Sequence, residues 1–277
     1  MESDTKYLNR KETNYRNFYL LLHMVAYPMY FITKNANLYK SFVSDCPVYF
    51  IAITLSFLLM LWFYTHSCQG AGYQTEEPKN IEGLYFSEAA GLHLQVRAGY
   101  CRWCKKVILR RDHHCPWTGH CIGRDNNLYF LVFTSSEAVI TTVVIFDLLF
   151  SFYHSFIAND YLWNIVQGAI TLGLVGTAWY ITFFITIQTL NSITVNTTIW
   201  EAKCHDRITY LENWPQWASP FNNGVVNNYI EFFTMKYRKT EWEMPKRPNL
   251  RDLIVPDDVK YKYEIAVRKG LVKPENS

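Results

Sequence analysis

The run VYFIAITLSFLLMLWFY, from Val48 to Tyr64, decides the fold class because it carries no charged residue. A buried helix of a soluble protein shows a polar face at a period near 3.6 residues, and this run shows none. Extended to Ser67, the uncharged stretch has the length of about 20 apolar residues that a bilayer-crossing helix needs. The run therefore predicts a membrane-spanning helix.

Three further stretches are similarly poor in charge: Asn17–Thr33, Leu128–Phe152 and the middle of Tyr161–Trp200. The first could be a cleaved signal peptide, but it follows a polar segment and ends without a small-residue cleavage pattern, which favours a permanent span. We expect an all-α integral membrane protein with four transmembrane helices. Its predicted spans are 17–33, 48–67, 128–152 and 168–190, and its predicted cytoplasmic regions are 1–16, 68–127 and 191–277.

Composition and charge support this assignment. Of the 277 residues, 49% are hydrophobic and 18% charged, which is typical of a membrane protein, and the net charge of +3 is not gathered on one element as nucleic-acid binding would require. The positive-inside rule places the basic N-terminus, the loop 68–127 and the C-terminal region in the cytoplasm. The sequon at Asn196 would then escape glycosylation.

Two acidic residues, Glu137 and Asp147, lie within the third predicted span. Acids in a membrane can mark a proton or ion pathway. These two stand on one helix with no basic partner in the other spans, so we expect polar groups that face the bundle, or acids near the membrane surface, and not a transporter.

The cysteines gather in the middle loop, where four of the seven lie between positions 101 and 121 together with three histidines. An odd total with one tight Cys/His cluster favours a metal site and a reactive thiol over disulfides. The spacing C-x2-C-x9-H-x6-C is typical of tetrahedral zinc. It is formed by Cys101, Cys104, His114 and Cys121.

Outside these four positions stand Cys115, His113 and Asp112. A thiolate nucleophile needs a base or a positive field, and His113 lies two residues before Cys115. Asp112 can fix the tautomer of that histidine. Spacing alone leaves open the alternative that Cys115 is the fourth zinc ligand and Cys121 a buried thiol. His120 is expected to be a solvated loop histidine.

The run DHHCPW from Asp112 to Trp117 resembles the signature of the DHHC-type protein S-acyltransferases, the palmitoyltransferases. The resemblance continues at Cys121, Gly123, Asn126 and Phe130. Thr197–Glu201 (TTIWE) resembles the family's TTxE element with one residue too many, and Pro220–Phe232 resembles its C-terminal P-[FY]-x-x-G-x3-N-x3-F motif.

This resemblance implies an enzyme in which Cys115 attacks a fatty acyl-CoA with His113 as base, and the acyl group then passes to a cysteine of a membrane-associated protein. It also implies that Cys101, Cys104, His114 and Cys121 bind one structural zinc and that the acyl chain lies among the spans. Endoplasmic reticulum or Golgi membranes are the implied location. The residues of the C-terminal motif are expected to pack a short helix against the membrane surface.

One departure from the family stands out. The positions of its usual second zinc site correspond here to Ser87, Ala90, Tyr100 and Val107, none of which is a zinc ligand. We expect Tyr100 and Val107 to replace that site by apolar packing. The missing site also raises a rival hypothesis, a weakly active relative that serves as a membrane scaffold or partner subunit.

Two further expectations concern charge and the tail. Basic residues that flank the cluster could meet coenzyme A phosphates or anionic lipid headgroups. They are Lys105, Lys106, Arg110, Arg111 and Arg124. From Met235 onward the chain is charged and rich in proline, so we expect a loosely structured tail.

Overall fold

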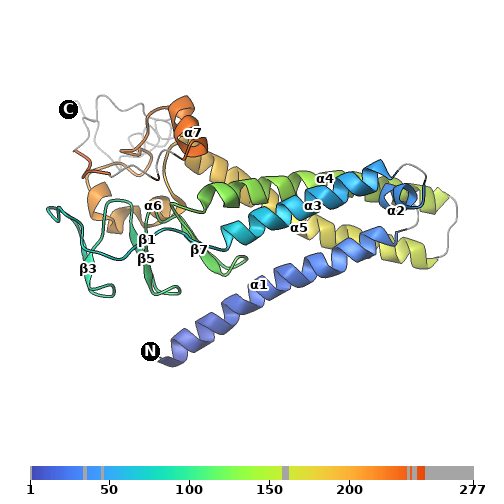
Figure 1. Ribbon diagram of the computed structural model, residues 1–277, viewed down its shortest axis with the longest axis horizontal. Helices are drawn as coiled ribbons and strands as arrows, with labels where there is room; N and C mark the ends of the chain where they lie inside the picture. Colours follow the sequence, from blue (N-terminus) through green and yellow to red (C-terminus); the bar gives the residue numbers. More distant parts are fainter. Residues whose placement is uncertain are drawn as a thin grey trace, which may run out of the picture.

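The computed structural model describes residues 2–33, 36–44, 47–157, 162–235, 238 and 242–246. Most of the predicted loose tail lies outside this range. Long helices run side by side, and the short strands gather with the C-terminal elements at one end of this bundle (Figure 1). The helices are α1 (Glu2–Phe31), α2 (Asn37–Phe42), α3 (Val48–Ser67), α4 (Asn127–Ile157), α5 (Leu162–Thr194), α6 (Ile199–Cys204) and α7 (Val225–Phe233), with 3-10 turns η1 (His205–Arg207) and η2 (Thr209–Leu211).

Within the described part of the chain, three helices are long and apolar enough to cross a membrane: Val48–Ser67, Asn127–Ile157 and Asn164–Thr194. The first coincides with the span predicted at 48–67, and the other two contain the predicted spans 128–152 and 168–190. Large apolar side chains such as Leu58, Phe146 and Phe184 stay exposed on these helices, as expected for surfaces that face lipid. The predicted span 17–33 falls largely in the C-terminal half of α1, which is not among these three helices.

Glu137 and Asp147 of α4 are buried in the bundle. This agrees with the expectation that they face the bundle, and not with the alternative that they lie near the membrane surface. Glu137 accepts a hydrogen bond from the Tyr19 hydroxyl, and its other oxygen lies 2.9 Å from His23 Nε2. Asp147 accepts from the Tyr30 hydroxyl and from the Asn37 backbone and side-chain amides. The expectation that Glu137 lacks a basic partner in the other spans was therefore wrong, because His23 of α1 reaches it.

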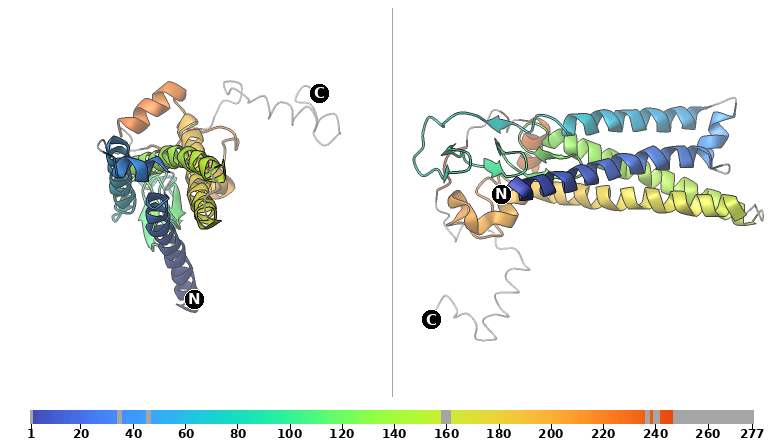
Figure 2. Two further views of the ribbon diagram at one scale, coloured as in Figure 1. Left: turned by 90° about the vertical axis from the view of Figure 1, so that its right-hand side faces the viewer. Right: turned by 90° about the horizontal axis from the view of Figure 1, so that it is seen from below.

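The strands form three small antiparallel units between α3 and α4. The hairpin of β6 (His113–Cys115) and β7 (His120–Ile122) leads into α4 through residues 123–126. Asn126 fixes this junction by donating to the backbone oxygens of Ser67 (2.8 Å) and Cys121 (3.0 Å). The strands are β1 (Tyr73–Gln74), β2 (Phe86–Ser87), β3 (Leu92–His93), β4 (Gly99–Cys101), β5 (Lys106–Ile108), β6 (His113–Cys115) and β7 (His120–Ile122). The end of α3 and the start of α4 thus hold the strand region directly over the bundle (Figure 2).

Candidate functional site

Alternate side chains of the hairpin β6–β7 lie on opposite faces, so its two faces carry different groups of residues. Successive side chains of a strand point to opposite faces, so His113 and Cys115 share one face and His114 takes the other. His114 pairs across the hairpin with Cys121. Cys121 packs with Cys101 and Ile108, whereas Cys115 packs with side chains of the helix bundle. One short hairpin therefore serves a thiol cluster on one side and the bundle on the other.

The four predicted metal ligands converge on the thiol side. The ligand atoms of Cys101, Cys104, His114 and Cys121 all lie within 4.8 Å of one another. His114 Nδ1 is 3.6, 3.4 and 3.5 Å from the three sulfurs in that order. Zinc bonds of 2.3 Å to sulfur and 2.0–2.1 Å to nitrogen at tetrahedral angles require N–S separations of about 3.6 Å. The donor set and its spacing fit zinc, and Cys115 is not part of the group.

Asp112, His113 and Cys115 form a connected set on the other side. The Asp112 Oδ2 atom lies 3.0 Å from His113 Nδ1, and its Oδ1 accepts a 2.7 Å hydrogen bond from the Ile199 backbone N–H. A carboxylate that accepts from Nδ1–H leaves the Nε2 lone pair for a thiol. Asp112 is 3% exposed and Cys115 1% exposed, so these contacts lie away from bulk water.

The protonation of this set follows from its contacts. Burial alone would lower the pKa of His113, but the hydrogen bonds to Asp112 and Cys115 outweigh it and raise the pKa to about 10. Burial likewise tends to raise the pKa of the Cys115 thiol, and the hydrogen bond to His113 reverses this and lowers the pKa. Both directions favour a thiolate–imidazolium pair, the reactive form of a cysteine nucleophile.

Thr118 is a site residue that the sequence analysis missed. Its side chain is fully buried in the turn between β6 and β7, where its hydroxyl lies 3.3 Å from the backbone oxygens of Cys115 and His120. Hydrogen bonds from its backbone and side chain also help to lower the pKa of the Cys115 thiol. The signal was the tight Pro116–Gly119 turn beside the nucleophile, since such turns aim backbone N–H groups at an anion. His120 is partly buried and lies outside the metal group.

The segment after α5 is tied to the site by a buried ion pair. Arg97, 0% exposed, donates to both carboxylate oxygens of Glu201 at 2.9 Å and to the Asn196 side chain at 3.0 Å. Thr198 and Glu201 form a reciprocal capping box at the start of α6. The T-x-x-E spacing from Thr198 to Glu201 fits a TTxE element without an extra residue if Ile199 occupies the position of the second threonine. The backbone N–H of Ile199 donates to Asp112.

The C-terminal motif is a structural brace. Asn228 of α7 donates to the Thr194 backbone oxygen at 2.8 Å and accepts from the Asn223 backbone N–H at 3.0 Å, which docks α7 on the end of α5. Val226, Ile230 and Phe233 remain exposed on the other side of this helix. Asn196 is buried and its amide donates to the Phe221 backbone oxygen at 2.9 Å, so a glycan on this nitrogen would have to break that bond.

Apolar side chains pack around Tyr100 and Val107. Tyr100 and Val107 are cross-strand neighbours in β4–β5. They join a cluster with buried Ala98 and Leu109, against which Ala90 also packs. Ser87 is buried in β2 and lines a pocket beside this cluster.

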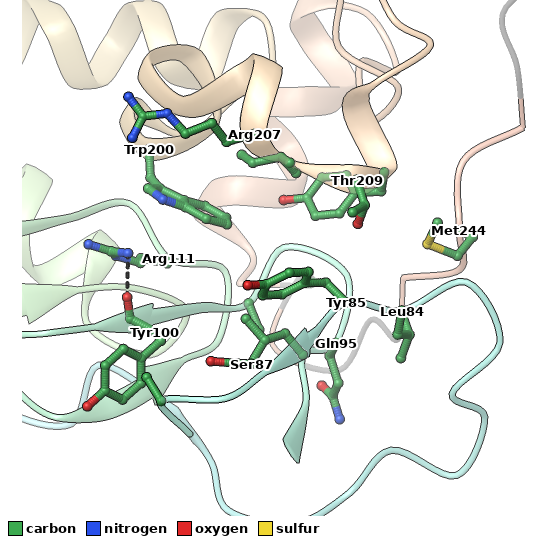
Figure 3. Close-up of a pocket in the computed structure, with 15 residues that line it drawn as sticks. Leu84, Tyr85, Ser87, Gln95, Tyr100, Arg111, Trp200, Arg207, Thr209 and Met244 are labelled. Carbon is green, nitrogen blue, oxygen red and sulfur yellow. Dashed lines mark hydrogen bonds between the residues drawn. The ribbon is translucent and has the colours of Figure 1, made fainter. Parts of the chain in front are cut away.

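A pocket of about 340 Å³ opens between the strands and the segment after α5. Arg111 and Arg207 line it from opposite walls, together with the rings of Trp200 and Tyr85 (Figure 3). Arg111 donates to the Tyr100 backbone oxygen at 2.7 Å and lies near the Trp200 ring. Of the five basic residues that the sequence analysis named, Arg111 lines this pocket, whereas Arg124 pairs with Asp125. Arg207 was missed, because nothing in the sequence relates it to the cysteine cluster.

The chain is similar to known palmitoyltransferases and protein S-acyltransferases. The family model of the DHHC palmitoyltransferase matches residues 80–205. Human "Palmitoyltransferase ZDHHC12" is 27% identical over 208 residues, which cover 68% of this chain and 74% of that protein. "Putative ZDHHC-type palmitoyltransferase 7" of Dictyostelium discoideum is 26% identical over 164 residues, and the match covers 37% of its length. "Protein S-acyltransferase 8" of Arabidopsis thaliana is 25% identical over 181 residues, 40% of its length.

Proposed function

Because the chain belongs to the DHHC palmitoyltransferase family, we propose that it transfers a long-chain fatty acyl group, such as palmitoyl, from acyl-CoA to cysteines of membrane-associated proteins through a thioester on Cys115. The observation that carries this proposal is the connected set of Asp112, His113 and Cys115 on the bundle side of β6. A nucleophile, a base and a group that orients the base are the parts that acyl transfer requires.

In the first step the Cys115 thiolate attacks the carbonyl carbon of the acyl-CoA thioester. The bond from that carbon to the coenzyme A sulfur breaks, and the His113 imidazolium gives its proton to the departing thiolate. The Thr118 turn lies beside the sulfur and is suited to stabilise negative charge there. Asp112 keeps Nδ1 protonated throughout, so that Nε2 is the nitrogen that exchanges the proton.

In the second step neutral His113 takes the proton from an incoming cysteine, whose sulfur attacks the Cys115 thioester. The Cys115 thiolate leaves, and the thiolate–imidazolium pair is restored. Zinc held by Cys101, Cys104, His114 and Cys121 would supply folding energy to the hairpin and take no part in the acyl chemistry.

The helix bundle is the proposed site of the acyl chain. Cys115 packs with Tyr19 of α1, Tyr64 of α3 and Phe133 of α4 at the head of the bundle. A chain that enters among these helices gains about 0.8 kcal/mol for each methylene buried. We propose that α1 is the fourth span at 17–33, because Tyr27 bonds Thr54 of α3, and Tyr30 bonds Asp147 of α4. The strand end of the bundle would face the cytoplasm of an endoplasmic reticulum or Golgi membrane.

The pocket beside the strands is the proposed site of the coenzyme A phosphates. Arg111 and Arg207 supply two guanidinium groups, which bind phosphate oxygens in pairs, and Trp200 offers a ring surface for a base. Arg111 directly precedes Asp112, and Trp200 directly follows the residue whose N–H serves that carboxylate. The pocket is therefore adjacent to the reacting groups by two separate connections.

Autoacylation in detergent with labelled palmitoyl-CoA tests the proposed activity, with zinc measured on the same samples. Wild-type protein should take a hydroxylamine-sensitive label and hold one zinc, and Cys115→Ser should keep the zinc and lose the label. Wild-type protein that holds zinc but takes no label would favour the alternative function, a membrane scaffold or partner subunit. That alternative is suggested by the apolar packing at Tyr100 and Val107 in place of a second metal site. Loss of zinc from Cys115→Ser would make this cysteine a ligand.

A further inference from the structure

A short segment of the C-terminal tail, residues 242–246, lies against the pocket proposed for coenzyme A. Met244 of this segment lines the pocket. Trp242 packs against the apolar cluster on which Trp200 also packs. The cluster is formed by Val96, Ile208, Tyr210, Leu211 and Phe221. The tail segment therefore shares its support with one wall of the pocket.

Both ends of segment 242–246 are held by other parts of the chain. The Trp214 indole N–H donates to the Lys246 backbone oxygen at 3.2 Å. At the other end, the centre of the Trp242 ring lies 5.2 Å from the guanidinium carbon of Arg97, which is fully buried. The sequence analysis expected a loosely structured tail, but this part of it is packed against the loop and the segment after α5.

Met244 lies between these two ends with its side chain at the pocket. A Cβ added at Gly83 would lie 3.5 Å from Met244 Cε, so the side chain passes close to this glycine. Met244 nevertheless stays 36% exposed. Figure 3 shows Met244 and Leu84 at the opposite end of the pocket from Arg111 and Arg207. The pocket therefore has a cationic end and an apolar end.

The two ends suit different parts of a nucleotide. Guanidinium groups bind phosphate oxygens in pairs, whereas a thioether makes favourable contacts with aromatic rings. In acyl-CoA the phosphates lie between the thioester and the adenosine. Arg111 directly precedes Asp112, so the cationic end is the one connected to the reacting groups. Adenosine beyond the phosphates would then extend toward the apolar end.

We propose that Met244 is a specificity-determining residue, which contacts the adenosine of acyl-CoA and closes the apolar end of the pocket. This inference rests on the proposed function. The contact strengthens binding of the donor and changes no bond of the acyl transfer, because Met244 lies in the pocket and not in the set of Asp112, His113 and Cys115. A donor without the nucleotide should therefore react independently of Met244.

Four variants separate contact with the donor from general damage to the fold. Met244→Ala removes the thioether, and Met244→Leu keeps an apolar side chain of similar volume. Trp214→Phe keeps a ring but removes the N–H that holds Lys246. Glu243→Ala is the matched control, because Glu243 belongs to the same segment but is exposed and outside the pocket lining.

The test is the rate constant of Cys115 labelling in detergent as a function of palmitoyl-CoA concentration. Met244→Ala should raise the half-saturating concentration about threefold to tenfold, the effect of losing one contact between sulfur and a ring, and leave the maximal rate at the wild-type value. Trp214→Phe should raise it less, Met244→Leu should restore most of the binding, and Glu243→Ala should match wild type. With the palmitoyl thioester of N-acetylcysteamine, which lacks phosphates and adenosine, wild type and Met244→Ala should react alike.

Other outcomes overturn the inference. An unchanged half-saturating concentration in Met244→Ala would show that this residue does not contact the donor, while the proposed function stands. A lower value would mean that the tail segment obstructs the pocket. An equal loss with the N-acetylcysteamine donor would mean damage to the reacting groups and no contact with adenosine. If wild type takes no label from palmitoyl-CoA, the proposed function itself has failed, and the inference fails with it.

Discussion

Two parts of the cysteine-rich loop are stabilised by different interactions. The part around Cys101, Cys104 and Cys121 brings three thiols and an imidazole within 4.8 Å, a geometry that a bound cation can stabilise. The part around Tyr100 and Val107 uses apolar packing across β4–β5. A metal concentrates its stabilisation in four ligands, whereas a cluster divides it among many contacts. Single substitutions should therefore have unequal effects on the two parts.

The largest effect is expected from Cys101→Ala. Zinc binding contributes about 10–16 kcal/mol of apparent free energy to the folding of small zinc domains, and loss of a ligand can remove much of it. The variant should lose the proposed zinc and take no acyl label, because the hairpin that carries Cys115 also carries two members of the Cys/His cluster. Zinc content and autoacylation on one sample measure this, with Cys204→Ala as the control. A variant that keeps both zinc and label would contradict the assignment of this cysteine as a ligand.

A smaller loss is expected where the loop meets the segment after α5. Arg97→Ala leaves the buried Glu201 carboxylate without its cation, which costs about 3–5 kcal/mol. Denaturation in detergent should show this loss while the zinc content stays at the wild-type value. Arg102→Ala, which removes an exposed arginine near the Trp103 ring, should cost about 1 kcal/mol or less. Equal costs for the two would mean that the Arg97 pair does not hold the two segments together.

Substitutions on the face of β6 that carries Cys115 should change the rate of autoacylation and its pH dependence. Asp112→Asn removes the carboxylate that orients His113 and should slow autoacylation about 10²–10⁴-fold. It should also lower the pKa of His113 from about 10 toward its ordinary value. Because folding raises the pKa of His113, its positive charge adds to the free energy of unfolding. This contribution is complete below about pH 6.5 and is lost as the pH rises through about 10.

The pH profile of Cys115 acylation in the variant should therefore fall at a lower pH than in wild type. Asp125→Asn is the control, because Asp125 pairs with Arg124 outside the reacting set. An unchanged profile in Asp112→Asn would show that this carboxylate does not govern the protonation of His113.

The sequence predicted most of these groups because their signals are local. Apolar runs predicted the long helices, and spacing within a short stretch predicted which cysteines gather with His114 and which cysteine lies with His113. What it missed depends on contacts between distant segments: His23 with Glu137, Arg97 with Glu201, and Arg207 across the pocket from Arg111. A single sequence carries no signal for such pairs, because either partner alone is an ordinary polar residue. Apolar packing at Val107 was inferred only because the resemblance marked a ligand as absent.

The smallest effect is expected in the apolar part. Val107 is 4% exposed, and Val107→Ala should cost about 1–3 kcal/mol, since neighbours of a deleted side chain relax only in part. The variant should keep its zinc and part of its acyl label, because the stabilisation is divided among Tyr100, Ala98 and Leu109 as well. Denaturation in detergent measures the cost, with Val226→Ala on the exposed side of α7 as a control that changes stability by about 0.5 kcal/mol or less. A Val107→Ala protein that loses its zinc like Cys101→Ala would show that the two parts are one cooperative unit, and that apolar packing is a condition for metal binding.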